Sequence, residues 1–294
     1  MKNILVLGSS GFVGSFTYTY LKKHYNVIGV SRYKSYFTDE QCDITKLEDI
    51  KNIIKKFKPN IVIHCIKLSA GVDYYETHKE EAYNVDIIGT NNIVECIKKY
   101  IPNSKVIYIS SDYVYDGTKG NYTEKDKENP INYYGILKLK AEKIIQSLDN
   151  HLILRPTVIF GFHPNGKNFF MQLLENQRNK KVMKVPMDQI SNPTYIKLLI
   201  KIIMRSIEKD LRGIYIATGP ESIDRYNFAL KLAQHFNFEK NLLVGVKTIE
   251  LNQSARRPLN CSTIPDKIQR NLNYNFPSLE ECIIDLKNEV KKWR

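Results

Sequence analysis

The chain has 294 residues, of which 43% are hydrophobic and 26% charged, so it can bury a sizeable core. Its net charge of +13 comes from scattered basic residues without a stacking motif of aromatic and basic side chains, which argues against a nucleic-acid partner. No segment approaches the roughly 18 apolar residues of a membrane span, and five dispersed cysteines predict reduced thiols in a cytoplasmic protein without a metal site.

Short apolar runs alternate with helical patterns through the first half of the chain. The runs at 4–7, 27–30, 61–66, 106–109 and 151–160 predict five strands. Apolar stripes predict helices between them, and Thr45 and Glu48 have the spacing of a capping box. Strands joined by helices of this length form βαβ units. The sequence therefore predicts an α/β fold with a Rossmann-type, doubly wound parallel sheet.

The second half has a looser rhythm. Helical pieces are predicted at 169–176, 194–208, 225–236 and 278–292, with short strands near 182–185 and 213–217. We therefore expect a core at 1–160 and a smaller C-terminal domain at 161–294. Segments near 182–217 are expected to return to the core.

A glycine-rich turn, GSSGFVG at residues 8–14, directly follows the first predicted strand and opens the first helix. Its glycines permit a tight turn and close approach of the backbone to a pyrophosphate, which the helix N-terminus attracts. A turn in this position is typical of a dinucleotide site, although its G-x-x-G-x-x-G spacing differs from the G-x-G-x-x-G of ordinary dehydrogenases. We expect residues 1–160 to be an NAD(P)-binding core.

The end of the second predicted strand carries Ser31, Arg32 and Lys34, where NAD enzymes usually have an acidic residue that holds the ribose 2′-hydroxyl. A guanidinium matches a 2′-phosphate in charge and geometry. NADP(H) is therefore the expected cofactor, with NAD(H) as the second choice. The alternative is that Arg32 only stacks on the adenine. Asp43 either holds the adenine edge or caps the next helix.

One helical segment, NYYGILKLKAE at 132–142, places Tyr134 four residues before Lys138. Residues at this spacing share a helix face. A phenol has an ordinary pKa of about 10, and a nearby ammonium favours the phenolate and eases departure of the proton. With 19 tyrosines and 44 lysines and arginines in the chain, chance can also supply this spacing.

Several of these segments resemble the extended short-chain dehydrogenase/reductase superfamily and, within it, the dTDP-4-dehydrorhamnose reductase family. The resemblance covers nearly the whole chain and is carried by GSSGFVG, VIYISSDYVYDG, NYYGILKLKAE, LILRPTVIFG and, near the end, RPLN. The regulatory subunit of methionine adenosyltransferase is also similar, notably around SSDYV. The family implies a smaller C-terminal domain that binds the substrate.

The resemblance implies a triad of Ser111, Tyr134 and Lys138, in which the serine hydroxyl bonds the substrate carbonyl and the lysine also binds the nicotinamide ribose. The expected substrate contacts are Ser111, Tyr113, Val114 and Arg257, the last for a diphosphate with Arg256 as the alternative. The expected cofactor contacts are Gly8, Ser10, Gly11, Phe12, Val13, Gly14, Ser31, Arg32, Asp43, Ile44, Cys65, Ile66, Lys67, Tyr134, Lys138 and Pro156.

Some positions have a second interpretation. Ser110 could take the polar role of Ser111, and Tyr133 could be mistaken for the acid although it is five residues from Lys138. Asn84 matches an asparagine of a family helix, where it would pack or take part in chemistry. Residues 64–69 read HCIKLS and depart from the family pattern. Cys65 there is expected to be a small buried residue.

The resulting hypothesis is an NADPH-dependent reductase of the 4-keto group of a nucleotide-diphospho-6-deoxy sugar, for surface glycan or polysaccharide synthesis. One alternative is a cofactor-binding regulatory subunit like that of methionine adenosyltransferase. Another is a related nucleotide-sugar epimerase or dehydratase, because Asp112 follows the serine of the triad as an acid does in dehydratases. We expect no membrane partner, and a homodimer stays open.

Overall fold

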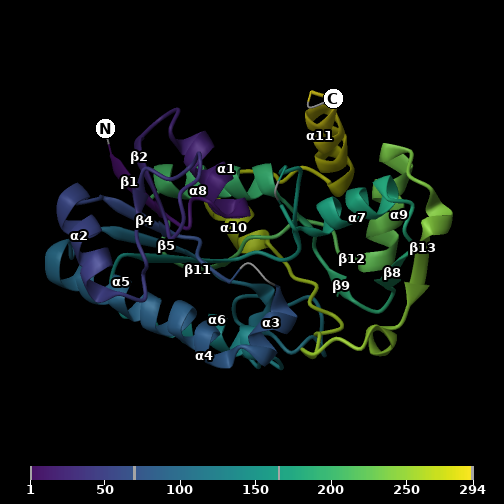
Figure 1. Ribbon diagram of the computed structural model, residues 1–294, viewed down its shortest axis with the longest axis horizontal. Coiled ribbons are helices and arrows are strands. Elements are labelled where there is room, and N and C mark those ends of the chain that lie inside the picture. Colours follow the sequence, from purple (N-terminus) through teal and green to yellow (C-terminus); the bar gives the residue numbers. More distant parts are fainter. Residues whose placement is uncertain (1, 69–70, 165, 293–294) are drawn as a thin grey trace.

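The computed structural model describes residues 2–68, 71–164 and 166–292. Its central feature is a seven-stranded sheet of order β11-β6-β5-β4-β1-β2-β3, in which all neighbours are parallel. This confirms the predicted α/β class with a doubly wound parallel sheet (Figure 1). The strands are β1 (Asn3–Leu7), β2 (Asn26–Ser31), β3 (Glu40–Gln41), β4 (Ile61–His64), β5 (Lys105–Ile109), β6 (His151–Arg155) and β11 (Gly213–Ile216).

Helices cover both faces of the sheet (Figure 1). In β1, Ile4 and Val6 pack into the cluster that contains α1 (Phe12–Leu21) and α8 (Ile196–Glu208). Leu5 and Leu7 point to the opposite face because strand side chains alternate. The helices on that face are α2 (Leu47–Phe57), α5 (Gly89–Tyr100) and α6 (Tyr133–Ile145). Burial on both faces explains why the strand sequences are almost entirely apolar.

The strand order reverses between β1 and β4, and this point positions the site. In open α/β sheets, ligands bind beyond the carboxyl ends of the strands where the order reverses. The chain leaves β4 there and forms α3 (Val72–Thr77), α4 (Lys79–Tyr83) and η1 (Asn84–Ile88), a π-helical turn that leads into α5. A second short turn, η2 (Asp112–Val114), follows β5 at the same edge.

The later part of the chain forms a smaller group of elements to one side of the sheet (Figure 1). Three pairs of short strands hold it together: β7 (Ile159–Phe160) with β10 (Thr194–Tyr195), β8 (Met183–Pro186) with β13 (Leu243–Val246), and β9 (Ile190–Ser191) with β12 (Ile223–Asp224). The remaining elements are α7 (Phe169–Arg178), α9 (Arg225–Phe236), η3 (Lys240–Leu242), η4 (Thr248–Leu251), α10 (Asp266–Leu272) and α11 (Leu279–Lys291). Of the segments near 182–217, β11 lies in the main sheet and β8 lies in a separate pair.

Some local predictions were wrong. The run at 151–160 is two strands, because β6 ends before Pro156, which lacks an N–H for the ladder. The strand predicted at 61–66 ends at His64. Thr45 does not cap α2: its hydroxyl donates to Oδ1 of Asp43 at 2.7 Å, and Lys46 occupies the N-cap without a side-chain bond. The two-residue strand β3 was not predicted.

Candidate active site

The glycine-rich turn lies between β1 and α1 at the carboxyl edge of the sheet. Gly8 has a φ of 84°, which favours glycine, and a Cβ on Gly14 would lie 2.0 Å from the carbonyl oxygen of Gly8. The N-terminus of α1 has no side-chain cap and no acidic residue in its first turn. The buried hydroxyl of Ser9 has no hydrogen-bond partner within the described chain. These features fit an anionic dinucleotide phosphate that would bind the turn through backbone and hydroxyl donors.

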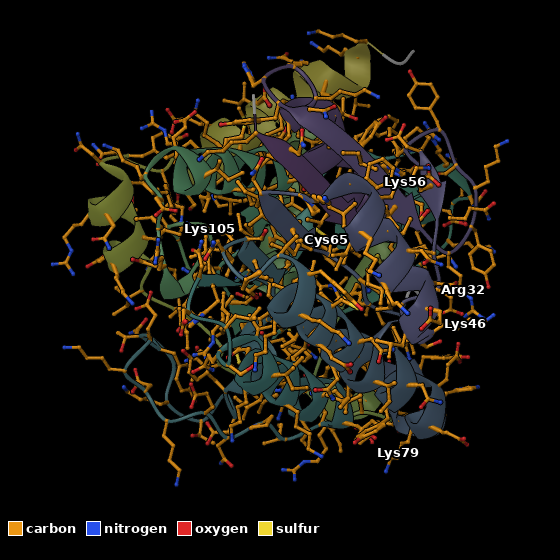
Figure 2. The ribbon with its side chains drawn as sticks, turned by 90° about the vertical axis from the view of Figure 1, so that its left-hand side faces the viewer. Arg32, Lys46, Lys56, Cys65, Lys79 and Lys105 are labelled. Carbon is orange, nitrogen blue, oxygen red and sulfur yellow. The ribbon has the colours of Figure 1, made fainter. Side chains whose placement is uncertain are left out.

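At the end of β2, a basic side chain faces Asp43. Nε of Arg32 lies 3.4 Å from Oδ2 of Asp43, and the Arg32 side chain is half-exposed. Burial raises the pKa of Asp43, but hydrogen bonds from Thr45 and the charges of Arg32 and Lys46 outweigh it and lower that pKa overall. Figure 2 shows Arg32 and Lys46 at the same side of the molecule. Arg32 and Lys46 therefore place two positive charges near the end of β2.

The segment after β4 borders the glycine turn. The amide of Cys65 donates to the carbonyl oxygen of Leu7, and burial raises the pKa of the Cys65 thiol to about 12. A Cβ on Gly8 would lie 2.9 Å from the Ile66 side chain. Lys67 is exposed, and its ammonium donates to the carbonyl oxygen of Leu68 at 3.2 Å. Cys65 is therefore a protonated thiol at neutral pH. Ser69, which belongs to the same segment, lies outside the described residues.

The side chains of Ile44 and Pro156, two of the predicted cofactor residues, are buried near the carboxyl edge of the sheet. The Ile44 side chain packs toward Gly89, where an added Cβ would lie 2.4 Å from it. Pro156 is buried, and its carbonyl oxygen accepts a hydrogen bond from the amide of Asp112 at 3.1 Å. Ser10 and Gly11 are exposed in the turn, and Phe12 and Val13 begin α1 with partly buried side chains.

The structure brings Ser111, Tyr134 and Lys138 together. Asn132 caps α6 by accepting a hydrogen bond from the amide of Gly135 at 2.8 Å, which fixes the start of the helix. Nζ of Lys138 lies 5.8 Å from the centre of the Tyr134 ring. Burial raises the pKa of Tyr134 to about 12, whereas the charge of Lys138 and the hydroxyl of Ser111 lower it. The Ser111 hydroxyl and the Lys138 ammonium therefore both lower the pKa of the Tyr134 phenol.

The neighbouring candidates point elsewhere. The Ser110 hydroxyl donates to Oε1 of Glu142 at 2.5 Å. Glu142 and Arg155 form a fully buried ion pair of 2.6 Å, which commits Ser110 to the network behind the strand ends. The Tyr133 hydroxyl donates to the carbonyl oxygen of Lys79 at 3.4 Å, on the outside of the fold. Neither residue shares the surroundings of Tyr134.

Asp112, next to Ser111, is also buried. Burial raises the pKa of Asp112 to about 6, although the Ser111 hydroxyl, which donates to it, lowers that pKa. Its Oδ1 accepts a hydrogen bond from the Ser111 hydroxyl at 3.0 Å, and that hydroxyl accepts one from the amide of Tyr113. Asp112 therefore orients Ser111 in this structure.

Two of the predicted substrate residues line one region, together with an arginine that the sequence did not identify. Tyr113 packs edge-on to Tyr134, and its pKa is raised to about 12 by burial and lowered by Arg257. Arg257 forms an ion pair with Asp73 at 2.6 Å. Arg225 lies over the ring of Phe169 and is close enough for Arg257 to lower its pKa, in addition to burial. Arg225 is the first residue of α9, and its place at the start of the helix predicted at 225–236 was the signal that the sequence offered.

Val114 and Arg256 lie differently. The Val114 side chain is fully buried in a small cluster with Tyr115, Tyr122, Ile216 and Cys261. Arg256 offers its carbonyl oxygen to the side-chain amide of Asn132 at 2.9 Å. The structure therefore does not place the Val114 side chain with Tyr113 and Arg257.

Sequence reasoning also missed the polar groups around Lys138. Nζ of Lys138 lies 3.3 Å from Oδ1 of Asp86 and 3.1 Å from the Tyr108 hydroxyl. Asn84, which matches a family asparagine expected either to pack or to take part in chemistry, is exposed, whereas Asp86 is buried. A lone acidic residue in the apolar run Val85–Ile88 was the available signal. The π-helical turn, which helical periodicity does not predict, brings Asp86 inward.

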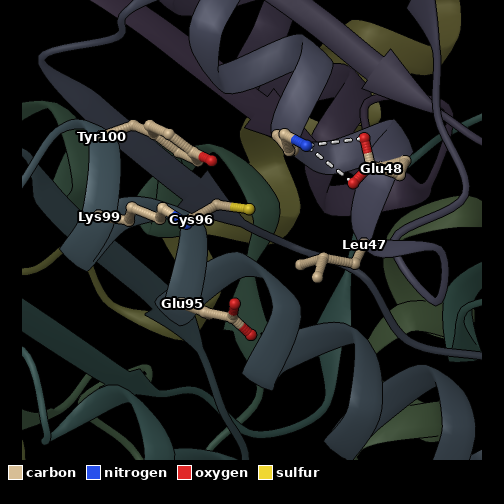
Figure 3. A pocket seen from close by; sticks show the side chains of 7 residues that line it. Leu47, Glu48, Glu95, Cys96, Lys99 and Tyr100 are labelled. Atoms are coloured by element: carbon tan, nitrogen blue, oxygen red, sulfur yellow. Dashed lines mark hydrogen bonds and ion pairs between the residues drawn. The ribbon is translucent and has the colours of Figure 1, made fainter.

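A separate pocket lies between α2 and α5 (Figure 3). It is lined by Leu47, Glu48, Lys51, Glu95, Cys96, Lys99 and Tyr100, with an ion pair between Lys51 and Glu48. None of these is a predicted site residue, so the pocket is not part of the candidate active site.

Two further properties concern the described residues only. In residues 2–68, 71–164 and 166–292, no group of three His, Cys, Asp or Glu side chains could hold a metal ion. Within the same ranges, every helix is too short or too polar to cross a bilayer.

Comparison with known proteins agrees with this geometry. Residues 1–291 match the family described as RmlD substrate binding domain. The chain belongs to this family. It is 30% identical over 284 residues to the dTDP-4-dehydrorhamnose reductase of Aggregatibacter actinomycetemcomitans, covering 92% of this chain and 93% of that protein. The resemblance expected from the sequence is confirmed.

Two other relatives define the range of the family. A crystal structure of dTDP-4-dehydrorhamnose reductase from Bacillus anthracis in complex with NADP has a TM-score of 0.88 and 26% identity, covering 98% of this chain and 99% of that one. Methionine adenosyltransferase 2 subunit beta from Danio rerio is 26% identical over 270 residues, covering 88% of this chain and 81% of that protein. Both kinds of relative foreseen from the sequence are therefore found.

Proposed function

We propose that the protein uses NADPH to reduce the 4-keto group of a nucleotide-diphospho-6-deoxy sugar. The observation that carries this proposal is the grouping of Ser111, Tyr134 and Lys138 at the carboxyl edge of the sheet in a chain of the RmlD family. Relatives named dTDP-4-dehydrorhamnose reductase, one of them in complex with NADP, support the reaction and the cofactor. NAD(H) is the second choice of cofactor.

The residues that would hold the cofactor lie along the edge already described. The backbone of residues 8–14 and the Ser9 hydroxyl would bind the phosphates, and Arg32 would face the 2′-phosphate. Bound NADPH supplies the hydride. Cys65, Ile66 and Lys67 would border the cofactor beside the turn, and Lys138 would bind the nicotinamide ribose.

Tyr134 provides the proton in this proposal. Reduction of a carbonyl places negative charge on its oxygen, which needs a proton donor and a polarising hydrogen bond. Tyr134 is protonated at neutral pH, as an ordinary phenol is, and burial raises its pKa further, to about 12. The ammonium of Lys138 stabilises the phenolate that remains after transfer. The Ser111 hydroxyl donates its one proton to Asp112 in the structure, and with substrate bound it would turn that proton from Asp112 to the carbonyl oxygen.

Arg257 and Arg225 are the proposed diphosphate site. Both guanidiniums neighbour Tyr113, and each affects the pKa of that phenol. Two like charges at close range repel, and a diphosphate between them would relieve that repulsion. The Asp73 carboxylate partly fills this role for Arg257 in the structure.

The test is a turnover assay with NADPH and a panel of dTDP-, UDP- and GDP-linked 4-keto-6-deoxy sugars. We expect consumption of the reduced cofactor with at least one of them. Tyr134→Phe should abolish turnover while NADPH binding, measured by fluorescence titration, is unchanged. Tyr133→Phe is the matched control and should retain turnover, because its hydroxyl contacts only Lys79 on the outside.

The alternative function is that of a regulatory subunit, favoured by the similarity to methionine adenosyltransferase 2 subunit beta. Tight NADPH binding with no turnover of any sugar in the panel would favour it. The setting we propose is the cytoplasm, where the free cysteines stay reduced, and the pathway is assembly of a surface glycan or polysaccharide.

A further inference from the structure

Asp86 forms a buried ion pair directly beneath the candidate active site. Its Oδ1 lies 3.3 Å from Nζ of Lys138, and both side chains are almost completely inaccessible to solvent. Asp86 belongs to η1, and its carbonyl oxygen accepts a hydrogen bond from the Thr90 hydroxyl at 2.5 Å. π-helical turns of this kind cost stability and often occur at functional sites. The irregular turn η1 therefore places the Asp86 carboxylate against Lys138.

Tyr75 extends this contact to the cofactor side of the site. Its hydroxyl donates to Oδ2 of Asp86 at 2.9 Å and accepts from the amide of Leu68 at 3.0 Å. Its ring packs edge-on to Tyr134, with ring centres 5.0 Å apart. Asp86 thus connects Lys138 on α6, Tyr75 on α3 and the segment that follows β4. One carboxylate links three elements that surround Tyr134.

Lys138 has a second fixed partner. Its ammonium donates to the Tyr108 hydroxyl on β5 at 3.1 Å. A lysine ammonium on a flexible stem needs such contacts to hold one position. The carboxylate also offsets the positive charge of Lys138, which by itself would favour the phenolate of Tyr134.

We propose that Asp86 is a positioning residue of this site: it fixes the Lys138 ammonium beside Tyr134, offsets the charge of that ammonium at the Tyr134 phenol, and through Tyr75 anchors the segment after β4. The catalytic consequence rests on the proposed function, whereas the effect on the charge state of Tyr134 does not. Burial is the main reason why the pKa of Tyr134 is raised; Lys138 and Ser111 lower that pKa, and the Tyr108 phenol and the negative charge of Asp86 raise it further.

Other titratable groups face the pair from the surrounding elements. Burial lowers the pKa of His64 to about 3, so it stays neutral, and Glu142 is paired with Arg155. The groups contributed by β4, the segment after it, α3, β5, η2 and α6 are His64, Lys67, Tyr75, Tyr108, Tyr113 and Glu142. Asp86 contacts Lys138, so removal of Asp86 leaves the positive charge of Lys138 beside Tyr134 without this carboxylate.

The first test measures ionisation of Tyr134 in the cofactor-free protein. A stopped-flow jump to about pH 11 reads phenolate absorbance before the chain can unfold, and subtraction of the same signal from a Tyr134→Phe background isolates Tyr134. Asp86→Asn should lower the pKa of Tyr134, because it removes a negative charge and leaves the Lys138 ammonium without its carboxylate. Asp210→Asn is the matched control, because it removes an equal charge from the ion pair with Lys105 at the start of β5.

An unchanged pKa of Tyr134 in folded Asp86→Asn would overturn the proposal, even if that variant is less stable. This result does not depend on turnover, so it is distinguishable from failure of the reductase assay. If Asp86→Asn does not fold, Tyr75→Phe decides. It should weaken NADPH binding about fivefold by releasing the amide of Leu68. Tyr74→Phe, whose hydroxyl contacts Glu81 on the surface, is its control, and equal affinities of the two variants would refute the linkage.

Discussion

The Ser110 hydroxyl donates a hydrogen bond to Oε1 of Glu142, while the adjacent Ser111 hydroxyl lies on the side of Tyr134 and Asp112. Two consecutive serines therefore face opposite sides of the strand end. Ser111→Ala should reduce kcat of the proposed reductase about a hundredfold, because it removes a donor to the developing oxyanion. Ser110→Ala is the matched control and should change kcat little. The opposite ranking of the two variants would move the polar role to Ser110.

Arg32 should determine the preference between NADPH and NADH. Its half-exposed guanidinium lies at the end of β2, held by Asp43. Arg32→Ala should weaken NADPH binding about tenfold and leave NADH binding nearly unchanged, because only NADPH carries the 2′-phosphate. Lys34→Ala tests whether an exposed positive charge two residues from Arg32 also contributes to the preference for NADPH over NADH. Equal losses for both cofactors on calorimetric titration would remove the basis for an NADP preference.

Asp73 should compete with the ligand for Arg257. The two side chains form an ion pair of 2.6 Å between α3 and the segment before α10. Asp73→Asn should free the guanidinium and tighten binding of dTDP a few-fold, as measured by isothermal titration calorimetry. Glu80→Gln on the exposed surface of α4 removes an equal charge and should have no effect. Weaker binding in Asp73→Asn would mean that the carboxylate mainly supports the loop through its bond to the amide of Ala255.

His64 should make the protein sensitive to acid. Burial, and secondarily the charge of Lys138, lower the pKa of His64 to about 3, below the value of about 6.5 in an unfolded chain. The unfolded state therefore binds the proton first, so stability is complete above pH 6.5 and declines as the pH falls from 6.5 toward 3.

Between pH 6.5 and 4.5, this single group should cost roughly 2–3 kcal/mol of unfolding free energy. Urea unfolding of His64→Gln should show a flatter dependence over that interval than the parent protein. Replacement of the exposed His24 by Gln should leave the slope unchanged. Parallel slopes for His64→Gln and the parent would contradict the assignment.

The sequence was informative where periodicity and local motifs decide structure. The apolar runs of β1, β2 and β5 and the glycine turn follow from short-range pattern, and so does the Tyr134–Lys138 spacing on α6. The π-helical turn of η1 breaks helical periodicity, so the inward direction of Asp86 could not be predicted from spacing. The two-residue strand β3 is too short for its pattern to stand out.

Long-range pairing was the other limit. Arg257 was expected to be available for a phosphate, but its ion pair with Asp73 joins residues 184 positions apart. Likewise, the choice between Ser110 and Ser111 depends on Glu142, which is 32 positions away along the chain. Such contacts depend on tertiary geometry that one sequence does not display.

The place of β11 in the sheet has a consequence for the order of folding. This strand, at residues 213–216, forms the edge beside β6, so the sheet that begins at residue 3 is incomplete until more than two-thirds of the chain has emerged from the ribosome. Until then, β6 presents an unpaired apolar edge that could join another nascent chain. A fragment that stops at residue 160 would keep that edge permanently. Truncation at residue 160 should therefore yield an aggregating polypeptide.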